Sequence, residues 1–243
     1  ADAIVLDVKT GSGAFMKKQE DSFALAREMV TLGNMAGRKT VAVVSDMDQP
    51  LGYAVGNALE VKEAIDTLRG QGPEDFVELC MTLGAQMVML GQMASTEEEA
   101  RAKLQQVLRD GSALDKLAEF VTAQGGSADA VYDPSLLPKA SIQQEIPARK
   151  EGYVQRIDCD EIGMCSLLLG GGRETKESEI DLSVGLILHK KVGDYVREGE
   201  TLATIYANDR EKLDAACERF LKAYHIGPEK VRRESLIKGI IRE

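Results

Sequence analysis

The stretch AIVLDVKTGSGAF, Ala3 to Phe15, decides the fold class. Its apolar, β-branched beginning predicts a buried strand over Ala3–Asp7, and a glycine-rich turn follows it. A second run of this kind, TVAVVSD at Thr40–Asp46, predicts another strand, covered on both faces. Between them lies an apolar stripe at helical spacing: Leu25, Met29, Leu32 and Ala36. The order strand, helix, strand predicts a right-handed parallel βαβ unit.

Helical patterns fill the next part of the chain. We expect a helix over about Val55–Leu68 and another that starts at Pro73. A capping box, either Ser95 with Glu98 or Thr96 with Glu99, predicts the start of a third. The turn-rich stretch that follows is typical of a connector.

Short strands and turns dominate from about Ile142, with one helix near Asp209–Ala223 and a final strand near Leu236–Ile241. The pattern VGDYVREGETL resembles barrel-sandwich domains of the biotinyl or lipoyl type, but it lacks the lysine that carries their cofactor. The fold class we expect is α/β: part of a helix-flanked sheet domain over 1–126, a connector over 127–145, and a small β-rich, barrel-sandwich-like α+β unit over 146–243.

Composition excludes several classes of protein. The net charge of −10 and the pI of about 4.9 argue against a nucleic-acid partner. We expect no membrane span, because no run of 18 apolar residues occurs. The four cysteines form no CxxC pair and no signal peptide precedes the first strand, so we expect reduced core thiols and a cytoplasmic location. With only two histidines, far apart, a zinc site is not expected.

The glycine-rich turn is a weak match to the known phosphate-binding loops. It lacks the GxxxxGK[ST] pattern, and Met16 stands where a dinucleotide-binding fingerprint needs its third glycine. From the residues alone, a tight strand-to-helix turn is the simpler interpretation. Three features favour a functional loop: the flexible pair Gly11 and Gly13, the large aromatic Phe15, and Lys9 at the carboxyl end of a strand, where open α/β sheets bind ligands.

The stretch SDMDQPLGYAVGNALEVKEA, Ser45 to Ala64, is the second candidate site. Its aspartates fit a polar turn. Pro50 to Gly52 end a strand in irregular backbone, whose carbonyls could face a cation, and Glu60 and Glu63 lie on the helix that follows. Carbonyls with one carboxylate would suit an alkali or alkaline-earth ion. Spacing alone leaves the choice between the two glutamates open.

Together the stretches DVKTGSGAF and DMDQPLGYAVGNALEVKEA resemble the pyrimidine-nucleoside phosphorylases, the family that includes thymidine phosphorylase. GPEDFVEL, GGGRETKESEIDLSVG and KKVGDYVREGE fit as well, so the resemblance covers essentially the whole chain. It implies phosphorolysis of pyrimidine nucleosides (uridine, thymidine, deoxyuridine) by inorganic phosphate to the free base and (deoxy)ribose 1-phosphate. It also implies two domains that close on the substrate, and a homodimer.

The resemblance assigns roles to five residues. Gly13 matches a loop glycine whose backbone bonds across the cleft on closure, and Phe15 matches an aromatic of the base pocket. Leu51 and Ala54 match residues whose carbonyls bind potassium, and Glu63 matches the carboxylate ligand of that ion. Lys9 receives no catalytic role and is interpreted as a loop or hinge residue.

The phosphate-binding and pyrimidine-binding motifs of the family do not occur in these 243 residues. In the family they lie upstream, with the rest of the potassium shell. We therefore expect a C-terminal part of such an enzyme, inactive alone and without catalytic residues of its own. Two alternatives remain: a transferase like anthranilate phosphoribosyltransferase, and a non-catalytic barrel-sandwich binding module.

Overall fold

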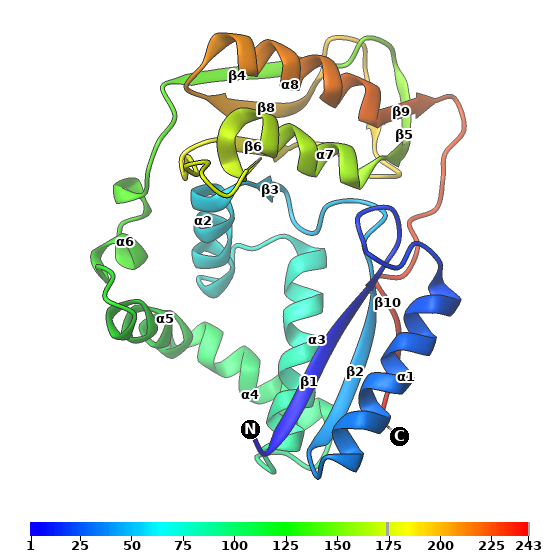
Figure 1. Ribbon diagram of the computed structural model, residues 1–243, viewed down its shortest axis with the longest axis vertical. Helices are drawn as coiled ribbons and strands as arrows, with labels where there is room; N and C mark the ends of the chain where they lie inside the picture. The colour runs from blue at the N-terminus through cyan, green and yellow to red at the C-terminus, as the bar shows by residue number, and fades with distance from the viewer. Residues whose placement is uncertain (174, 243) are drawn as a thin grey trace. The chain divides into compact units, whose positions relative to one another are not determined.

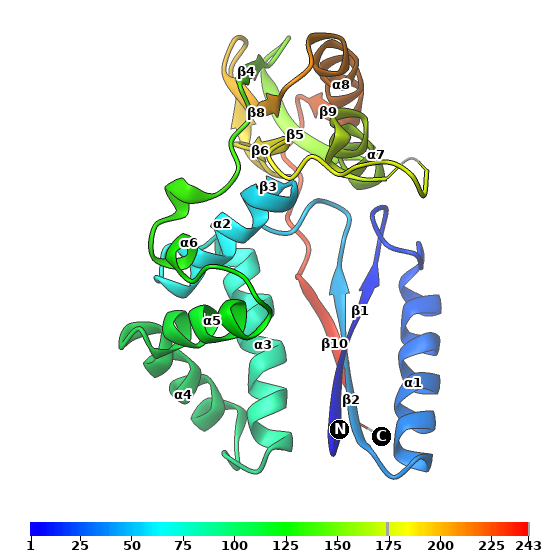
Figure 2. The same ribbon diagram turned by 60° about the vertical axis from the view of Figure 1, so that its left-hand side comes forward.

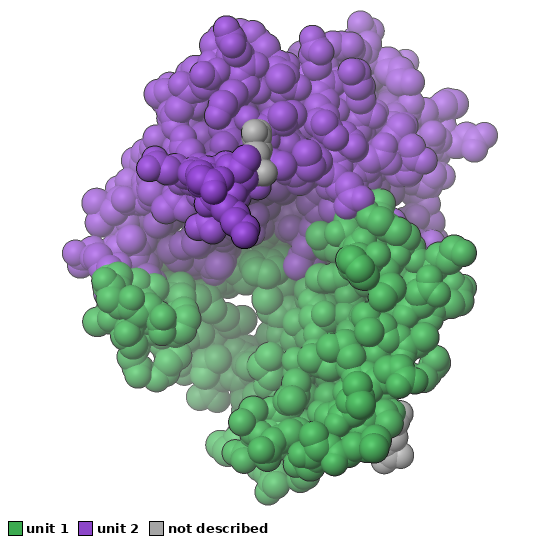
Figure 3. Space-filling model, viewed as in Figure 1, with its two compact units in different colours: residues 1–47, 66–126, 235–243 green, residues 48–65, 127–234 purple. Residues whose placement is uncertain are grey.

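The computed structural model describes residues 1–173 and 175–242. These form two compact units (Figure 3, green and purple). Unit 1 comprises 1–47, 66–126 and 235–243, and unit 2 comprises 48–65 and 127–234. Each unit thus contains segments that lie far apart in the sequence. The division expected from the sequence, at 126/127 and 145/146, instead cuts the chain into consecutive ranges.

Unit 1 is built on a three-stranded sheet of order β1-β2-β10 (Figure 1). β1 (Ala3–Thr10) and β2 (Lys39–Asp46) pair in parallel and are joined by α1 (Gln19–Met35), so the predicted βαβ unit is confirmed. β10 (Ile237–Ile241) pairs antiparallel with the other edge of β2. Because β2 is central, six of its eight residues are buried, as a doubly covered strand requires.

The helix α1 covers one face of this sheet, and α3 (Glu74–Leu90) covers the other (Figure 2). The fully buried residues of α1 are Ser22, Ala26 and Val30. The predicted Leu25 and Met29 are partly buried against the same core, whereas Leu32 is 63% exposed. The apolar stripe predicted for this helix is therefore partly wrong. The helix packs closely on the strands, and small side chains one turn apart permit that approach where larger ones would not.

The strand β10 is anchored to β2 by a buried ion pair. Lys238 Nζ lies 3.1 Å from Asp46 Oδ1, and the two side chains are 7% and 13% exposed. The Asp46 N–H also donates to the Leu236 carbonyl at 2.8 Å. The predicted strand near Leu236–Ile241 exists, but it completes the sheet of unit 1 rather than the β-rich unit with which the sequence grouped it.

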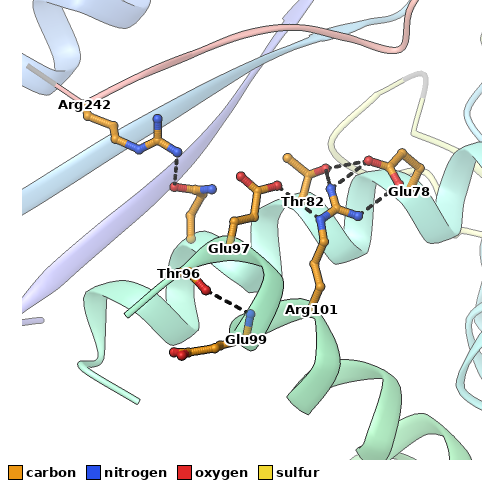
Figure 4. A network of polar contacts seen from close by, with 8 residues as sticks. Glu78, Thr82, Thr96, Glu97, Glu99, Arg101 and Arg242 are labelled. Carbon is orange, nitrogen blue, oxygen red and sulfur yellow. Dashed lines mark hydrogen bonds and ion pairs between the residues drawn. The ribbon is translucent and has the colours of Figure 1, made fainter. Parts of the chain in front are cut away.

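A polar network joins α3 to α4 (Glu97–Arg109) (Figure 4). The Arg101 guanidinium donates to both oxygens of Glu78, at 3.1 and 2.8 Å, and to Thr82 Oγ1 at 2.8 Å. It also donates to Glu97 at 3.1 Å, one turn earlier on its own helix. The hydrogen bond from Arg101 is the main reason why the pKa of Glu78 lies below its ordinary value.

The helix α4 begins at a side-chain cap. Thr96 Oγ1 accepts from the Glu99 N–H at 3.2 Å, and Glu99 Oε2 in turn accepts from the Ser95 N–H at 2.9 Å. Of the two predicted capping boxes, the one of Thr96 with Glu99 forms, with its return bond shifted by one residue. The helix α5 (Ser112–Ala123) follows.

Unit 2 contains two small antiparallel sheets, of order β3-β6-β8-β4 and β7-β5-β9, with helices packed on them. Its strands are β3 (Ala54–Val55), β4 (Ile142–Pro147), β5 (Gly152–Ile157), β6 (Gly185–Leu188), β7 (Tyr195–Val196), β8 (Thr201–Ala207) and β9 (Tyr224–Gly227). Its helices are α2 (Asn57–Leu68), which crosses the division at 65/66, α6 (Asp129–Tyr132), η1 (Pro134–Leu136), α7 (Cys159–Ser166), η2 (Leu167–Gly171) and α8 (Arg210–Ala223). This is the β-rich α+β unit that the sequence predicts.

The core of unit 2 lies between these sheets and the helices α7 and α8. Phe220 of α8 is fully buried, and its ring centroid lies 4.7 Å from that of Tyr224. The four cysteines are free thiols, and Cys159 and Cys165 are buried, but Cys80 is exposed, so the prediction of core thiols is wrong there. Among the described residues, no helix has both the length and the apolar character to cross a membrane.

Candidate functional site

The glycine-rich loop after β1 is a compact turn within unit 1. Gly11 adopts a φ of 119°, and its N–H donates to the Met16 carbonyl at 3.1 Å. The Ala14 N–H donates to the Gly11 carbonyl at 3.0 Å, and the Gly13 N–H to the Met47 carbonyl at 2.9 Å. A phosphate loop presents its N–H groups to the ligand. Three N–H groups here already have carbonyl partners, which is consistent with a closing loop rather than a phosphate cradle.

Phe15 projects from this turn into solvent. Its side chain is 94% exposed, the most exposed large apolar side chain in the described part of the protein. An aromatic ring in that state gains free energy when a planar group covers it, because its apolar faces then leave water. Gly13 and Phe15, both singled out by the sequence, thus lie on one turn beside the end of β2.

Lys9 lies inside β1, not in the loop. Its ammonium is 2.5 Å from Asp7 Oδ2 and 3.0 Å from Ser45 Oγ, and the Ser45 hydroxyl donates to Asp7 Oδ1. These contacts tie β1 to β2 at the paired positions Lys9 and Ser45. The structure places Lys9 in the sheet, so the interpretation as a loop residue is wrong, and a hinge role stays a prediction.

The second candidate site lies in unit 2, where the segment 48–56 passes the start of α2. Glu63, on the second turn of that helix, points back to the segment. Its Oε1 accepts from the Tyr53 N–H at 2.8 Å and from the Ala54 N–H at 3.1 Å. Glu60 is engaged differently, since its Oε1 accepts from the Gly56 N–H at 2.9 Å as a cap of the same helix. Of the two glutamates, Glu63 is therefore the one beside the backbone of Tyr53 and Ala54.

The pairing of β3 with β6 shows which way the Ala54 carbonyl points. The Leu188 N–H donates to the Tyr53 carbonyl at 2.8 Å, and Ala54 is the next residue along, opposite Ile187. In an antiparallel ladder, hydrogen-bonded and non-hydrogen-bonded pairs alternate, so the N–H and C=O of Ala54 face away from β6. The Ala54 N–H there meets Glu63. The Ala54 carbonyl and the Glu63 carboxylate consequently lie on the same outer side of β3.

These oxygens fit a hard, weakly polarising cation. Backbone carbonyls and a single carboxylate are the ligands that alkali and alkaline-earth ions take. Among the described residues, no cluster of three or more His, Cys, Asp or Glu side chains occurs that could hold a metal ion. A cation at this place would therefore depend on carbonyl ligands, and one carboxylate suits a single positive charge better than two.

Sequence reasoning missed one residue at this site, Lys191, whose ammonium reaches the carbonyls of the same segment. It is the second lysine of KKVGDY, in a predicted turn between strands. Lysines in turns are usually solvated, and nothing in the local pattern indicates that this one is buried.

Two family models match the chain. Residues 1–114 match the α/β domain of a glycosyl transferase family, and residues 153–227 match the C-terminal domain of pyrimidine nucleoside phosphorylases. A glycosyl-transferase α/β domain followed by this C-terminal domain makes the chain similar to glycosyl transferases of the nucleoside phosphorylase class.

Curated relatives agree with that class. The chain is 56% identical to pyrimidine-nucleoside phosphorylase of Bacillus subtilis over 243 residues, which is 100% of this chain and 56% of the relative. It is 56% identical to that of Geobacillus stearothermophilus over 237 residues (98% and 54%) and 54% identical to that of Staphylococcus haemolyticus over 243 residues (100% and 56%). The chain is thus similar to pyrimidine-nucleoside phosphorylases along its whole length. It spans just over half the length of these relatives.

Proposed function

We propose that this chain supplies part of the active site of a pyrimidine-nucleoside phosphorylase. The whole enzyme cleaves the N-glycosidic bond of uridine, thymidine or deoxyuridine with inorganic phosphate and releases the free base and (deoxy)ribose 1-phosphate. The observation that carries this proposal is the 56% identity, along all 243 residues, to a relative of that name. The matched C-terminal domain favours it over a phosphoribosyltransferase of the anthranilate type, and the matched transferase domain favours it over a non-catalytic module.

Phosphorolysis requires the protein to position the reactants and to stabilise the charges that develop, and it requires no nucleophile on the protein. The anomeric carbon becomes cationic as the base leaves with a negative charge, and phosphate attacks from the opposite face. The groups that bind phosphate and hold the pyrimidine are proposed to lie upstream of Ala1, as the resemblance implies. The chain described here contributes a wall of the pocket and part of a cation site.

The loop of Gly13 and Phe15 is proposed to close over the nucleoside. The exposed Phe15 ring offers a face to the pyrimidine. For Gly13 to form a bond on closure with an acceptor outside unit 1, its N–H has to give up the Met47 carbonyl. The exchange replaces one hydrogen bond with another, so its net free-energy cost is small and the loop can move during each turnover.

The cation is proposed to be potassium, held by the carbonyls of Leu51 and Ala54 and the carboxylate of Glu63, together with upstream ligands. The ion would neutralise the carboxylate and hold the turn in one conformation. The placement of Glu63 beside the Ala54 backbone supports this set over one with Glu60.

The cation site is tested in a longer protein, made by joining the upstream region of the Bacillus subtilis relative to Ala1. Its melting temperature is measured in potassium chloride and in choline chloride at equal ionic strength. Potassium should raise it, because an ion that binds only the folded state stabilises that state. Glu63→Gln keeps an acceptor for the Tyr53 and Ala54 N–H groups but removes the charge, and should abolish the rise. Glu60→Gln is the matched control and should retain it. An equal rise in the Glu63→Gln variant would exclude Glu63 as a ligand.

The activity is tested in the same longer protein by following uracil release from uridine. We expect release only when phosphate is present, with ribose 1-phosphate as the second product. Free ribose as the product would show hydrolysis and would contradict phosphorolysis.

A homodimer and a cytoplasmic location complete the proposal. The resemblance supports the first, and sedimentation velocity of the longer protein measures it. The free thiols of all four cysteines support the second, because disulfides are typical of oxidising compartments.

A further inference from the structure

Lys191 is a buried cation at the candidate cation site. It lies between β6 and β7 in unit 2 and is only 4% exposed. Its ammonium donates to the carbonyl of Pro50 and, at 2.7 Å, to that of Gly52. It also lies 5.7 Å from the ring centroid of Tyr53, within the range of a cation–π contact.

These contacts stabilise the folded protein, because a buried ammonium has lost its hydration. The loss is offset only where acceptors replace the water. Two carbonyls from one turn provide such acceptors, and hydrogen bonds from a charged donor are stronger than neutral ones. The next residue adds a second tie, since the Val192 N–H donates to Gln49 Oε1 at 2.9 Å. The turn between β6 and β7 therefore fixes the segment 49–53 at two places.

These hydrogen bonds divide the carbonyls of the segment into those that already accept a bond from Lys191 or Leu188 and those that do not. Lys191 takes those of Pro50 and Gly52, and the Leu188 N–H takes that of Tyr53. Leu51 and Ala54 are the residues of this run that neither Lys191 nor Leu188 holds. They are also the two whose carbonyls are assigned to potassium in the proposed function.

We propose that Lys191 is a positioning residue for the cation site. By holding the carbonyls on either side of Leu51, its ammonium fixes the turn in the conformation in which the carbonyls of Leu51 and Ala54, with Glu63, can receive a monovalent ion. The inference rests on the proposed potassium site. It gives the C-terminal β-rich unit a role in that site, through a side chain that touches neither the nucleoside nor the ion.

A purely structural role and a positioning role differ in what they change. Loss of a structural tie lowers the melting temperature equally in every salt. Loss of a positioning tie also weakens potassium binding, and removal of groups that orient metal ligands typically costs about 10- to 100-fold in affinity. Lys190 is the matched control, because it precedes Lys191 directly but pairs with Glu200 instead.

The test measures the melting temperature of the longer protein against potassium chloride concentration, with choline chloride keeping the ionic strength constant. Lys191→Met should raise the half-saturating potassium concentration about 10- to 100-fold. Lys190→Met should leave it unchanged. Lys191→Gln, which keeps a donor and is milder for folding, should raise it as well.

An unchanged half-saturating concentration in Lys191→Met or Lys191→Gln would overturn the inference, even if those variants melt earlier. If the unsubstituted protein shows no potassium dependence, the proposed potassium site fails and the inference fails with it. The two failures are distinguishable, because the second is seen before any substitution is made.

Discussion

Replacement of Gly52 by alanine would test the geometry of the turn beside Glu63. Gly52 adopts a φ of +65°, and a Cβ placed on it would lie 2.1 Å from Glu63 Oε2 and 2.9 Å from Glu63 Cδ. No side chain tolerates such contacts, so the carboxylate has to swing away. That movement breaks its hydrogen bonds with the N–H groups of Tyr53 and Ala54.

The expected loss of stability has two parts. Left-handed backbone costs an alanine about 1–2 kcal/mol. The two bonds to the half-buried carboxylate contribute about 1 kcal/mol each. Gly199 in the same unit provides the control, because its φ is +81° and a Cβ there would meet nothing within 4 Å. Gly199→Ala should therefore lose about 1–2 kcal/mol, and Gly52→Ala about 2 kcal/mol more.

Urea unfolding followed by tyrosine fluorescence measures this difference. The chain has no tryptophan, and all six of its tyrosines lie in unit 2, within 48–65 and 127–234, so the signal reports on the unit that contains both glycines. Equal losses in the two variants would refute the close approach of Glu63 to Gly52, and with it the described geometry of the turn.

Three further predictions concern other parts of the chain. Arg101→Met should lower the free energy of unfolding above pH 4.5, the ordinary pKa of a glutamate. The difference in that free energy from the unsubstituted protein should shrink as the pH falls through the lowered pKa of Glu78, and urea unfolding at several acid pH values measures it. Thr96→Ala should cost about 1 kcal/mol through loss of the α4 cap, measured by urea unfolding followed by circular dichroism, and Thr96→Ser should cost much less. Burial raises the pKa of Cys165 to about 12, so a thiol reagent at mildly alkaline pH should label the exposed Cys80 first and Cys165 only after unfolding, as mass spectrometry of the labelled peptides would show.

The local parts of the fold could be predicted from the sequence. β2 is an apolar, β-branched run, and such runs occur where both faces of a strand are buried. β1 is a strand as predicted, but its predicted burial over Ala3–Asp7 is wrong, because β1 lies at the edge of the sheet and only its residues Val8 and Thr10 are buried. The pairing of β10 with β2 could not be predicted from the sequence. Pairing between strands some 190 residues apart depends on contacts such as that of Lys238 with Asp46, which no local pattern encodes. In α1 the pattern of large apolar residues located Leu25 and Met29, which pack against the core, but it missed Ser22 and Ala26, the small residues that close packing on the sheet selects.

In the candidate site, too, some residues could be predicted from the sequence and others could not. Gly13, Phe15 and Glu63 were indicated by their residue types and the resemblance, but only the structure shows that Glu63 meets the backbone of β3 while Glu60 caps α2. Lys191 could not be found from the sequence, since its burial depends on a segment about 140 residues away.

The proposed division of the active site is tested most directly by uracil release from uridine in the presence of phosphate. The release is compared between these 243 residues alone and the longer protein that carries the upstream region. We expect no release by the 243 residues and clear release by the longer protein, because the groups proposed to bind phosphate and pyrimidine are supplied upstream. Release by the 243 residues alone would contradict this division of the active site and would require the loop of Gly11 and Gly13 to be reconsidered as the phosphate site.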